Sequence, residues 1–420
     1  MDRVKLGSLC LQITDGEHGT VKDNPEGTFY YLNNNNITES GIEIRDGDRR
    51  IDRDTFSAIR RRTNLEQNDV VIATCGTLGK TQVIRSDPDN YEFSRSVGMI
   101  KPNPSFVLAD YIHYYFTLPA SQLRIQQIAT GGVQKHFYIE DMANFDIDLP
   151  SLETQRAVVD VLRSIDGKIA NNKKLMAELE ETARLIYDYW FTQFDFPDEH
   201  GKPYRSSGGK MVRNESLKYS IPKGWQAGTL ASLGEIISGA TPSTAIPTNY
   251  AETGIAWITP NDLSDSDGRM HIGHGERDIS EQGLKACSAQ LMPPGSVIMS
   301  SRAPIGYLAV STEQCCTNQG CKSLIPKNGY EPYFIFLTMK RRMPIIKAQG
   351  VGTTFTEVSK DTLASIPLEL PPTTIAAQFE ELVMPLCTQI KALEQESKEL
   401  SALRDWLLPM LMNGQATIRE

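Results

Sequence analysis

The feature that most constrains the fold of this chain is a heptad pattern of apolar residues that occurs twice. The first copy runs from residue 158 to residue 190 in alternating steps of three and four, and nine of its ten positions are apolar. Adding 221 to each position gives a second pattern, from residue 379 to residue 411, with eight apolar positions of ten. Such a pattern, kept over more than four heptads, predicts a long helix packed in a coiled coil.

The equal lengths of the two patterns predict that the two helices pack against each other as an antiparallel pair. Ser151 and Thr373 are expected to cap the helix starts, and Pro385 is expected to kink the second helix or delay its regular start. Asn172 lies on the seam, where it either fixes the register or leaves a partly wet gap. The predicted seam contacts are Leu162, Ile165, Ile169, Met176, Leu179, Leu386, Ile390, Leu393, Leu400 and Leu407.

The segments that precede the two helices also match each other in order. The matched pairs are Leu6–Leu9 with Leu230–Leu233, Val70–Gly79 with Val297–Gly306, and Ile147–Pro150 with Leu368–Pro371. Their offsets of 224, 227 and 221 differ only by small insertions. The chain therefore carries two copies of one domain, each followed by a long helix.

These signals divide the chain into five parts. A globular domain at 1–150 is followed by a spacer helix at 151–192, a linker at 193–220 rich in Gly, Pro, Ser and charge, a second domain at 221–370 and a second spacer helix at 371–414. Short strands and turns dominate each domain without regular strand–helix alternation. The predicted fold class is α+β (mixed α/β), a pseudo-twofold repeat of two globular domains separated by an antiparallel helix pair.

Composition indicates a globular protein outside the membrane. The 420 residues are 40% hydrophobic and 23% charged, with a mean hydropathy of −0.33, no apolar run of membrane-spanning length and no secretory signal. Seven cysteines without a paired spacing favour a reducing compartment, so we expect a cytoplasmic protein. The net charge of −9 argues against a basic coat for nucleic acid but allows a localised basic site.

The sequence offers no convincing catalytic or metal site. Thr74–Thr81 resembles a phosphate-binding loop, but Thr74 replaces its first glycine and the matching turn at Gly306 lacks a lysine. Asn103–Phe106 resembles the loop that holds a flipped adenine in amino-methyltransferases, but a glycine-rich cofactor loop is missing. The clustered cysteines Cys315, Cys316 and Cys321 lack a standard zinc spacing. We therefore expect no catalytic residue, no metal and no cofactor on this chain.

The repeat instead favours recognition of an extended or repeated partner. The first seam spans about 48 Å at about 1.5 Å per residue, which corresponds to about 14 base pairs of DNA. Two similar domains joined by such helices suit a DNA target that is split into two parts.

Six segments of the second copy, in order and spacing with the two helices, resemble the specificity subunits of type I restriction–modification systems. They are Ile221–Trp225, Ser238–Ser243, Trp257–Leu263, Ile279–Leu284, Ser300–Gly306 and Thr317–Gly320. The first copy lacks the Pro-x-Gly-Trp opening and has Ser94–Ser96 where the second has Asn318–Gly320. The resemblance implies two target recognition domains that read a bipartite double-stranded DNA sequence, one half-site each.

The same resemblance implies a non-catalytic subunit that assembles with others. The helices would bind two modification subunits, adenine methyltransferases that use S-adenosylmethionine, and through them ATP-dependent restriction subunits. S-adenosylmethionine, ATP and Mg²⁺ are then expected only on those partners. The alternative is a stand-alone DNA adenine methyltransferase or nuclease with an unrecognised active site.

Base readout needs donors and acceptors at groove edges, while basic residues contact phosphates. The paired turns Thr77–Lys80 and Ser301–Pro304 and the loops Gln134–His136 and Gly352–Thr354 supply such groups. The predicted DNA-binding residues are Thr77, Lys80, Lys135, His136, Ser301, Arg302, Thr353 and Thr354.

Overall fold

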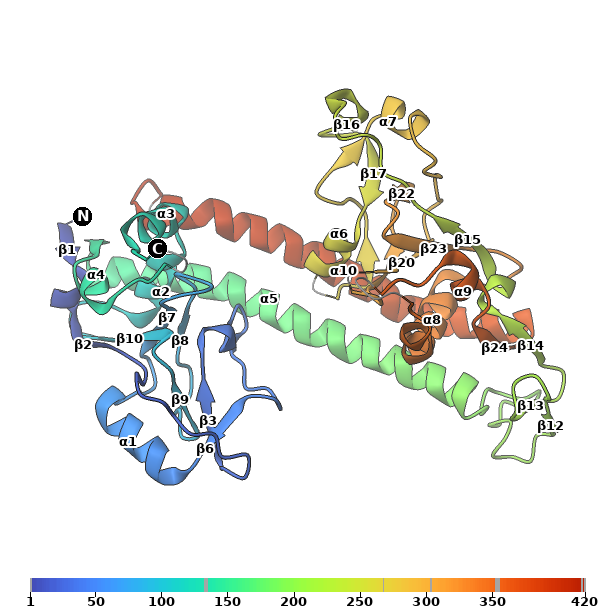
Figure 1. Ribbon diagram of the computed structural model, residues 1–420, viewed down its shortest axis with the longest axis horizontal. Coiled ribbons are helices and arrows are strands. Elements are labelled where there is room, and N and C mark those ends of the chain that lie inside the picture. The colour runs from blue at the N-terminus through green and yellow to red at the C-terminus, as the bar shows by residue number, and fades with distance from the viewer. Residues whose placement is uncertain are drawn as a thin grey trace. The chain divides into compact units, whose positions relative to one another are not determined.

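A computed structural model describes residues 2–131, 135–266, 268–302, 304–351, 356–416 and 418. The chain divides into two compact units (Figure 1). Unit 1 consists of residues 1–171 and 398–420, and unit 2 consists of residues 172–397. Each unit therefore contains one globular domain together with parts of both long helices.

Unit 1 contains three main sheets. Its elements are β1 (Asp2–Lys5), β2 (Cys10–Asp15), β3 (Phe29–Leu32), β4 (Ile37–Thr38), β5 (Gly41–Ile42), β6 (Arg49–Ile51), α1 (Arg53–Thr63), β7 (Val70–Ala73), β8 (Thr81–Val83), β9 (Tyr91–Phe93), β10 (Val97–Pro102), α2 (Ala109–Thr117), α3 (Pro119–Ile128), α4 (Ile139–Ala143) and β11 (Asp146–Leu149). Strands β2-β10-β7-β8 form an antiparallel sheet, β6-β3-β9 form a second in which β3 and β9 are parallel, and β1 pairs with β11.

Unit 2 repeats this arrangement. Its elements are β12 (Met211–Arg213), β13 (Ser220–Pro222), β14 (Gln226–Thr229), β15 (Gly234–Ser238), β16 (Tyr250–Ala251), β17 (Ile255–Ile258), α6 (Pro260–Asp265), β18 (His271–Ile272), β19 (Asp278–Ile279), α7 (Glu281–Lys285), β20 (Val297–Ser300), β21 (Leu308–Ser311), β22 (Cys315–Thr317), β23 (Cys321–Pro326), α8 (Pro332–Ala348), α9 (Lys360–Ala364) and β24 (Pro367–Leu370). The sheet β15-β23-β20-β21-β18 matches β2-β10-β7-β8 with one added strand. The parallel pair β17–β22 matches β3–β9, and β14–β24 matches β1–β11. The predicted α+β fold with an internal repeat is confirmed.

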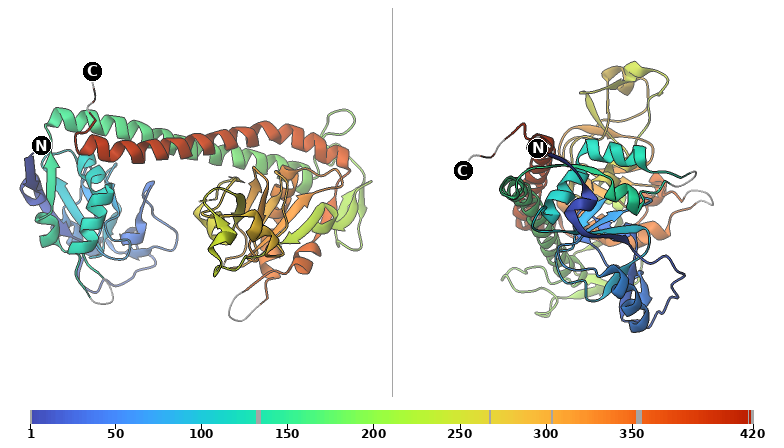
Figure 2. Two further views of the ribbon diagram at one scale, coloured as in Figure 1. Left: turned by 90° about the horizontal axis from the view of Figure 1, so that it is seen from above. Right: turned by 90° about the vertical axis from the view of Figure 1, so that its left-hand side faces the viewer.

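The two long helices are α5 (Leu152–Tyr187), extended by a π-helical turn at Asp188–Thr192, and α10 (Thr373–Met412). Within each unit they lie side by side, as the green and red ribbons in Figure 2 show. They run in opposite directions in both units. In unit 1 Arg404 Nη1 lies 3.0 Å from Asp166 Oδ1, and in unit 2 Asn172 Nδ2 donates to Glu396 Oε2 at 2.7 Å.

The residues named above as seam contacts are all buried or half-buried. Asn172 is fully buried and also bonds Ser397 Oγ at 3.3 Å, which favours a role in register over a wet gap. Pro385 does not delay the second helix, because α10 begins at Thr373 and continues through the proline. A single proline removes one backbone donor, and here Val383 and Cys387 on either side are buried in the unit 2 core.

The segment 193–220, which we predicted as a linker, is folded onto unit 2. Phe194 and Phe196 are buried against Trp225, with ring centroids 5.4 and 5.3 Å away. Asp195 accepts a hydrogen bond from the backbone N–H of Ser206 at 2.7 Å. Composition alone suggested flexibility, whereas two phenylalanines give the segment an apolar surface to bury.

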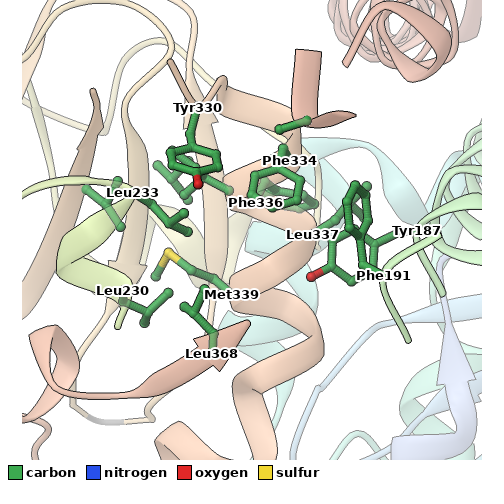
Figure 3. Packing of buried hydrophobic residues seen from close by; sticks show 14 of the residues in the cluster. Tyr187, Phe191, Leu230, Leu233, Tyr330, Phe334, Phe336, Leu337, Met339 and Leu368 are labelled. Atoms are coloured by element: carbon green, nitrogen blue, oxygen red, sulfur yellow. The ribbon is translucent and has the colours of Figure 1, made fainter. Parts of the chain in front are cut away.

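The core of unit 2 joins the end of α5 to α8 (Figure 3). Tyr187 and Phe191 pack against Phe334, and the centroids of Phe191 and Phe334 are 4.9 Å apart. The Tyr187 hydroxyl bonds Thr338 Oγ1 at 3.0 Å. The helix end therefore supplies part of the core of this unit.

A buried carboxylate on α10 caps α8. Glu380 accepts hydrogen bonds from the backbone N–H groups of Tyr333 at 3.1 Å and Phe334 at 2.8 Å. These are N–H groups of the first helical turn, which have no partner within the helix. Burial raises the pKa of Glu380 to about 7, although the two N–H donors act in the opposite direction.

This carboxylate predicts a pH dependence of stability. Because the pKa of Glu380 is higher in the folded chain than in the unfolded chain, the folded chain binds the proton more tightly between pH 4.5 and about 7. The free energy of unfolding should therefore fall as the pH rises through this window, by up to about 3 kcal/mol. Urea unfolding at several pH values should show this fall in the wild type and lose it in Glu380→Gln. The exposed neighbour offers a control, since Glu381→Gln should follow the wild-type curve. Parallel curves for wild type and Glu380→Gln would contradict the assignment.

Candidate nucleic-acid interface

In unit 1, four loops meet at one edge of the sheets. Strands β3 and β9 are parallel, so they end at the same side, and β7 ends beside them. The backbone N–H of Thr74 donates to Ser96 O at 2.9 Å, and that of Asn34 donates to Ser96 Oγ at 3.1 Å. The N–H of Phe137 donates to Thr74 O at 2.9 Å. These bonds join the loops after β3, β7, β9 and α3 into one surface, which we call the recognition edge of unit 1.

Unit 2 builds the same edge with equivalent bonds. The backbone N–H of Ser301 donates to Gly320 O at 2.8 Å, and that of Asn318 donates to Ile258 O at 3.0 Å. The N–H of Val358 donates to Ser301 O at 3.0 Å. The ends of β17, β20 and β22 and the segment before α9 thus form the recognition edge of unit 2.

The predicted DNA-binding residues of unit 1 lie at its edge. Thr77 is exposed on the turn between β7 and β8, and Lys80 is half-buried at the end of that turn. Lys135 is exposed and donates through Nζ to Gln126 O at 2.8 Å. His136 pairs through its backbone with the chain at residue 130 and stacks on Tyr138, which is 54% exposed. The edge therefore offers hydroxyl, ammonium, imidazole and aromatic groups.

The predicted residues of unit 2 differ in accessibility. Arg302 is half-buried, and its Nη1 lies 3.9 Å from Glu357 Oε2. Ser301 is fully buried, and its Oγ donates to Gly320 O at 3.0 Å. Our assignment of Ser301 to a DNA contact is therefore corrected, because its hydroxyl holds the loop together from the inside. Thr353 and Thr354 lie outside the described residues.

A buried lysine supports the edge of unit 2. Lys322 Nζ donates to Gln319 O at 3.2 Å and to Glu357 Oε1 at 3.1 Å, and it lies 3.3 Å from Ser301 Oγ. The corresponding position of unit 1 is Gly98, where the space above the backbone is filled by the end of the Met142 side chain. The two edges thus share a backbone plan but rest on different chemistry.

Two exposed edge residues were missed in the sequence. Arg95 lies between Ser94 and Ser96, and the structure gives its guanidinium no acidic partner among the described residues. Gln319 lies at the same place in unit 2 and accepts a hydrogen bond from Thr241 Oγ1. We had treated Ser94–Ser96 only as a departure from the pattern of the second copy. Its register with Asn318–Gly320 was the signal that could have found Arg95.

The described residues contain no group of three or more His, Cys, Asp or Glu side chains placed to hold a metal ion. Burial raises the pKa of Cys315 to about 11 and that of Cys316 to about 12, and it also raises the pKa of Cys321. These thiols therefore stay protonated near neutral pH and are poor nucleophiles. Within the same residues, no helix is both long enough and apolar enough to span a bilayer.

Comparisons with known proteins agree with this architecture. A family model described as the type I restriction modification DNA specificity domain matches the chain twice, over residues 4–181 and 222–400. The crystal structure of a type I restriction–modification S subunit from M. genitalium superimposes with a TM-score of 0.55 at 16% identity, covering 98% of this chain and 95% of that one. That likeness concerns the fold.

Two related specificity subunits share sequence with this chain. The MjaIX type I restriction enzyme specificity subunit of Methanocaldococcus jannaschii is 34% identical over 198 residues, which is 45% of this chain and 45% of that protein. The HindI specificity subunit of Haemophilus influenzae is 23% identical over 388 residues, covering 80% of this chain and 84% of that protein. The alternative of a stand-alone methyltransferase or nuclease is not favoured by these matches. The chain belongs to the type I restriction–modification DNA specificity family.

Proposed function

We propose that this chain reads a bipartite double-stranded DNA target, with the recognition edge of each unit contacting one half-site. The observation that carries the proposal is the repeated edge. Each unit joins the same strand ends by the same backbone bonds but presents different side chains, such as Arg95 in unit 1 and Gln319 in unit 2. Donors and acceptors that differ between two similar frames would read two different sequences.

The long helices would act as the assembly surface. The chain would bind two modification subunits and, through them, ATP-dependent restriction subunits, acting in the cytoplasm as a non-catalytic specificity subunit. S-adenosylmethionine, ATP and Mg²⁺ would then be bound by the partners. Exposed apolar side chains on both helices, including Leu185, Leu382 and Trp406, support a role in protein contacts.

Selection from a pool of randomised DNA duplexes tests the bipartite target. The full chain should enrich duplexes with two fixed blocks at constant spacing. Arg302→Ala should weaken selection within one block only, because Arg302 belongs to the edge of unit 2. Enrichment of one continuous block, or of no sequence, would contradict bipartite recognition.

Salt titration tests the role of Arg95. Replacing a phosphate-contacting cation lowers affinity by a similar factor for all sequences and reduces the slope of log K against log salt by about 1. Arg95→Ala should show this change in the full chain. The control is Lys223→Ala, which alters an exposed cation on the turn after β13 and should keep the wild-type slope. An unchanged slope in Arg95→Ala would remove Arg95 from the interface.

Co-expression with the modification subunit encoded beside this chain tests the assembly. A particle with two modification subunits for each copy of the chain should form, and sequencing of the host DNA should map methylated adenines to the split motif. Absence of the complex would contradict the assembly role without affecting DNA recognition by the chain alone.

A further inference from the structure

Four consecutive asparagines, Asn33–Asn36, follow β3 at the recognition edge of unit 1, and two of them build the turn. Asn33 Oδ1 accepts from the N–H of Asn35 at 2.9 Å, while Asn36 Oδ1 accepts from the N–H of Asn33 at 2.9 Å. Asn36 is buried, and its Nδ2 donates to Glu43 O at 2.8 Å. The amides of Asn33 and Asn36 are therefore used in this reciprocal cap.

The two middle asparagines present their amides outward. Asn35 is exposed and Asn34 is half-buried. Asn34 Nδ2 lies 3.4 Å from Asn35 Oδ1, so the two amides face each other. Among the described residues, Asn34 Oδ1 and Asn35 Nδ2 have no partner, which leaves one acceptor and one donor side by side. Flipping both amides exchanges the two roles but still leaves one of each.

This amide pair is held inside the recognition edge. The N–H of Asn34 bonds Ser96 Oγ, and Arg45 donates to Asn35 O at 3.2 Å. On the other side, Gly76 adopts φ +68°, and a Cβ there would lie only 2.7 Å from Asn34 Nδ2. Loops after β7 and β9 thus enclose the pair, and its position is fixed by backbone contacts.

Unit 2 repeats the cap but changes the outward groups. Thr259 and Asp262 cap the turn after β17, and Asp262 Oδ2 accepts from the N–H of Thr259 at 2.7 Å. The positions between them are Pro260 and Asn261, and Asn261 Nδ2 donates to Asp265 Oδ2 at 2.7 Å. The frame is retained while the outward side chains differ, which is what a position that determines specificity requires.

We propose that Asn34 and Asn35 together read an adenine in the half-site bound by unit 1. This inference rests on the proposed function. The major-groove edge of adenine offers an N7 acceptor and an N6 donor, which match one donor and one acceptor on the protein. Guanine presents two acceptors at this edge and matches the pair less well.

The test uses the full chain and duplexes in which each base pair of its selected target is changed in turn. Asn35→Ala should lose about 5- to 100-fold in affinity for the target, and it should no longer discriminate at one adenine of one half-site. Asn35→Asp leaves only acceptors, so it should prefer cytosine, whose N4 is a donor, at that same position. A purely structural role for Asn35 would not produce a changed base preference.

Two controls separate reading from folding. Asn261→Ala alters the equivalent turn of unit 2 and should leave the preference at that adenine unchanged. Asn36→Ala removes a buried cap and should lower the unfolding temperature while keeping the base preference of the remaining folded protein. A wild-type chain that selects no target would overturn the proposed function itself. A selected target with unchanged base preference in Asn35→Asp, or a uniform loss of affinity for all duplexes, would overturn this inference alone.

Discussion

The burial of the apolar faces of α5 and α10 is the constraint on which the rest of the structure depends. In unit 2 the end of α5 contributes Tyr187, Trp190 and Phe191 to the core, and in unit 1 the end of α10 contributes Leu408 and Leu411. Burying such side chains stabilises each by about 1.5–3 kcal/mol. Each unit therefore requires helix segments from both halves of the sequence, so neither repeat forms a complete core alone.

Buried polar groups on the helices fix how each sheet lies on its own helix. On α10, Glu394 accepts from the N–H of Met270 at 2.7 Å and bonds His271 Nδ1 at 2.8 Å. On α5, Gln155 accepts from the N–H of Leu108 at 3.0 Å. Apolar packing tolerates small rotations, but a buried polar group that loses its partner is costly. These contacts hold the domain in one orientation on the helix within each unit.

The two recognition edges show how one frame carries different chemistry. Backbone bonds at Thr74 and Ser301 are equivalent, so the loops keep their positions in both units. Below them, a buried Lys322 with Glu357 in unit 2 takes the place of Gly98 in unit 1. Because the backbone holds the edge together, side chains on and beneath it can change without loss of the fold.

The sequence by itself determined the repeat, the two long helices and the α+β class, because apolar periodicity and matched segments are local patterns. It also placed Thr77, Lys80, Lys135, His136 and Arg302 near the edges through the register of the two copies. Only the tertiary structure decided that Ser301 lies inside, that 193–220 is folded, and that Asn34 and Asn35 are the outward members of their run. Those outcomes depend on hydrogen bonds and packing between residues far apart in the chain, which a linear pattern does not record.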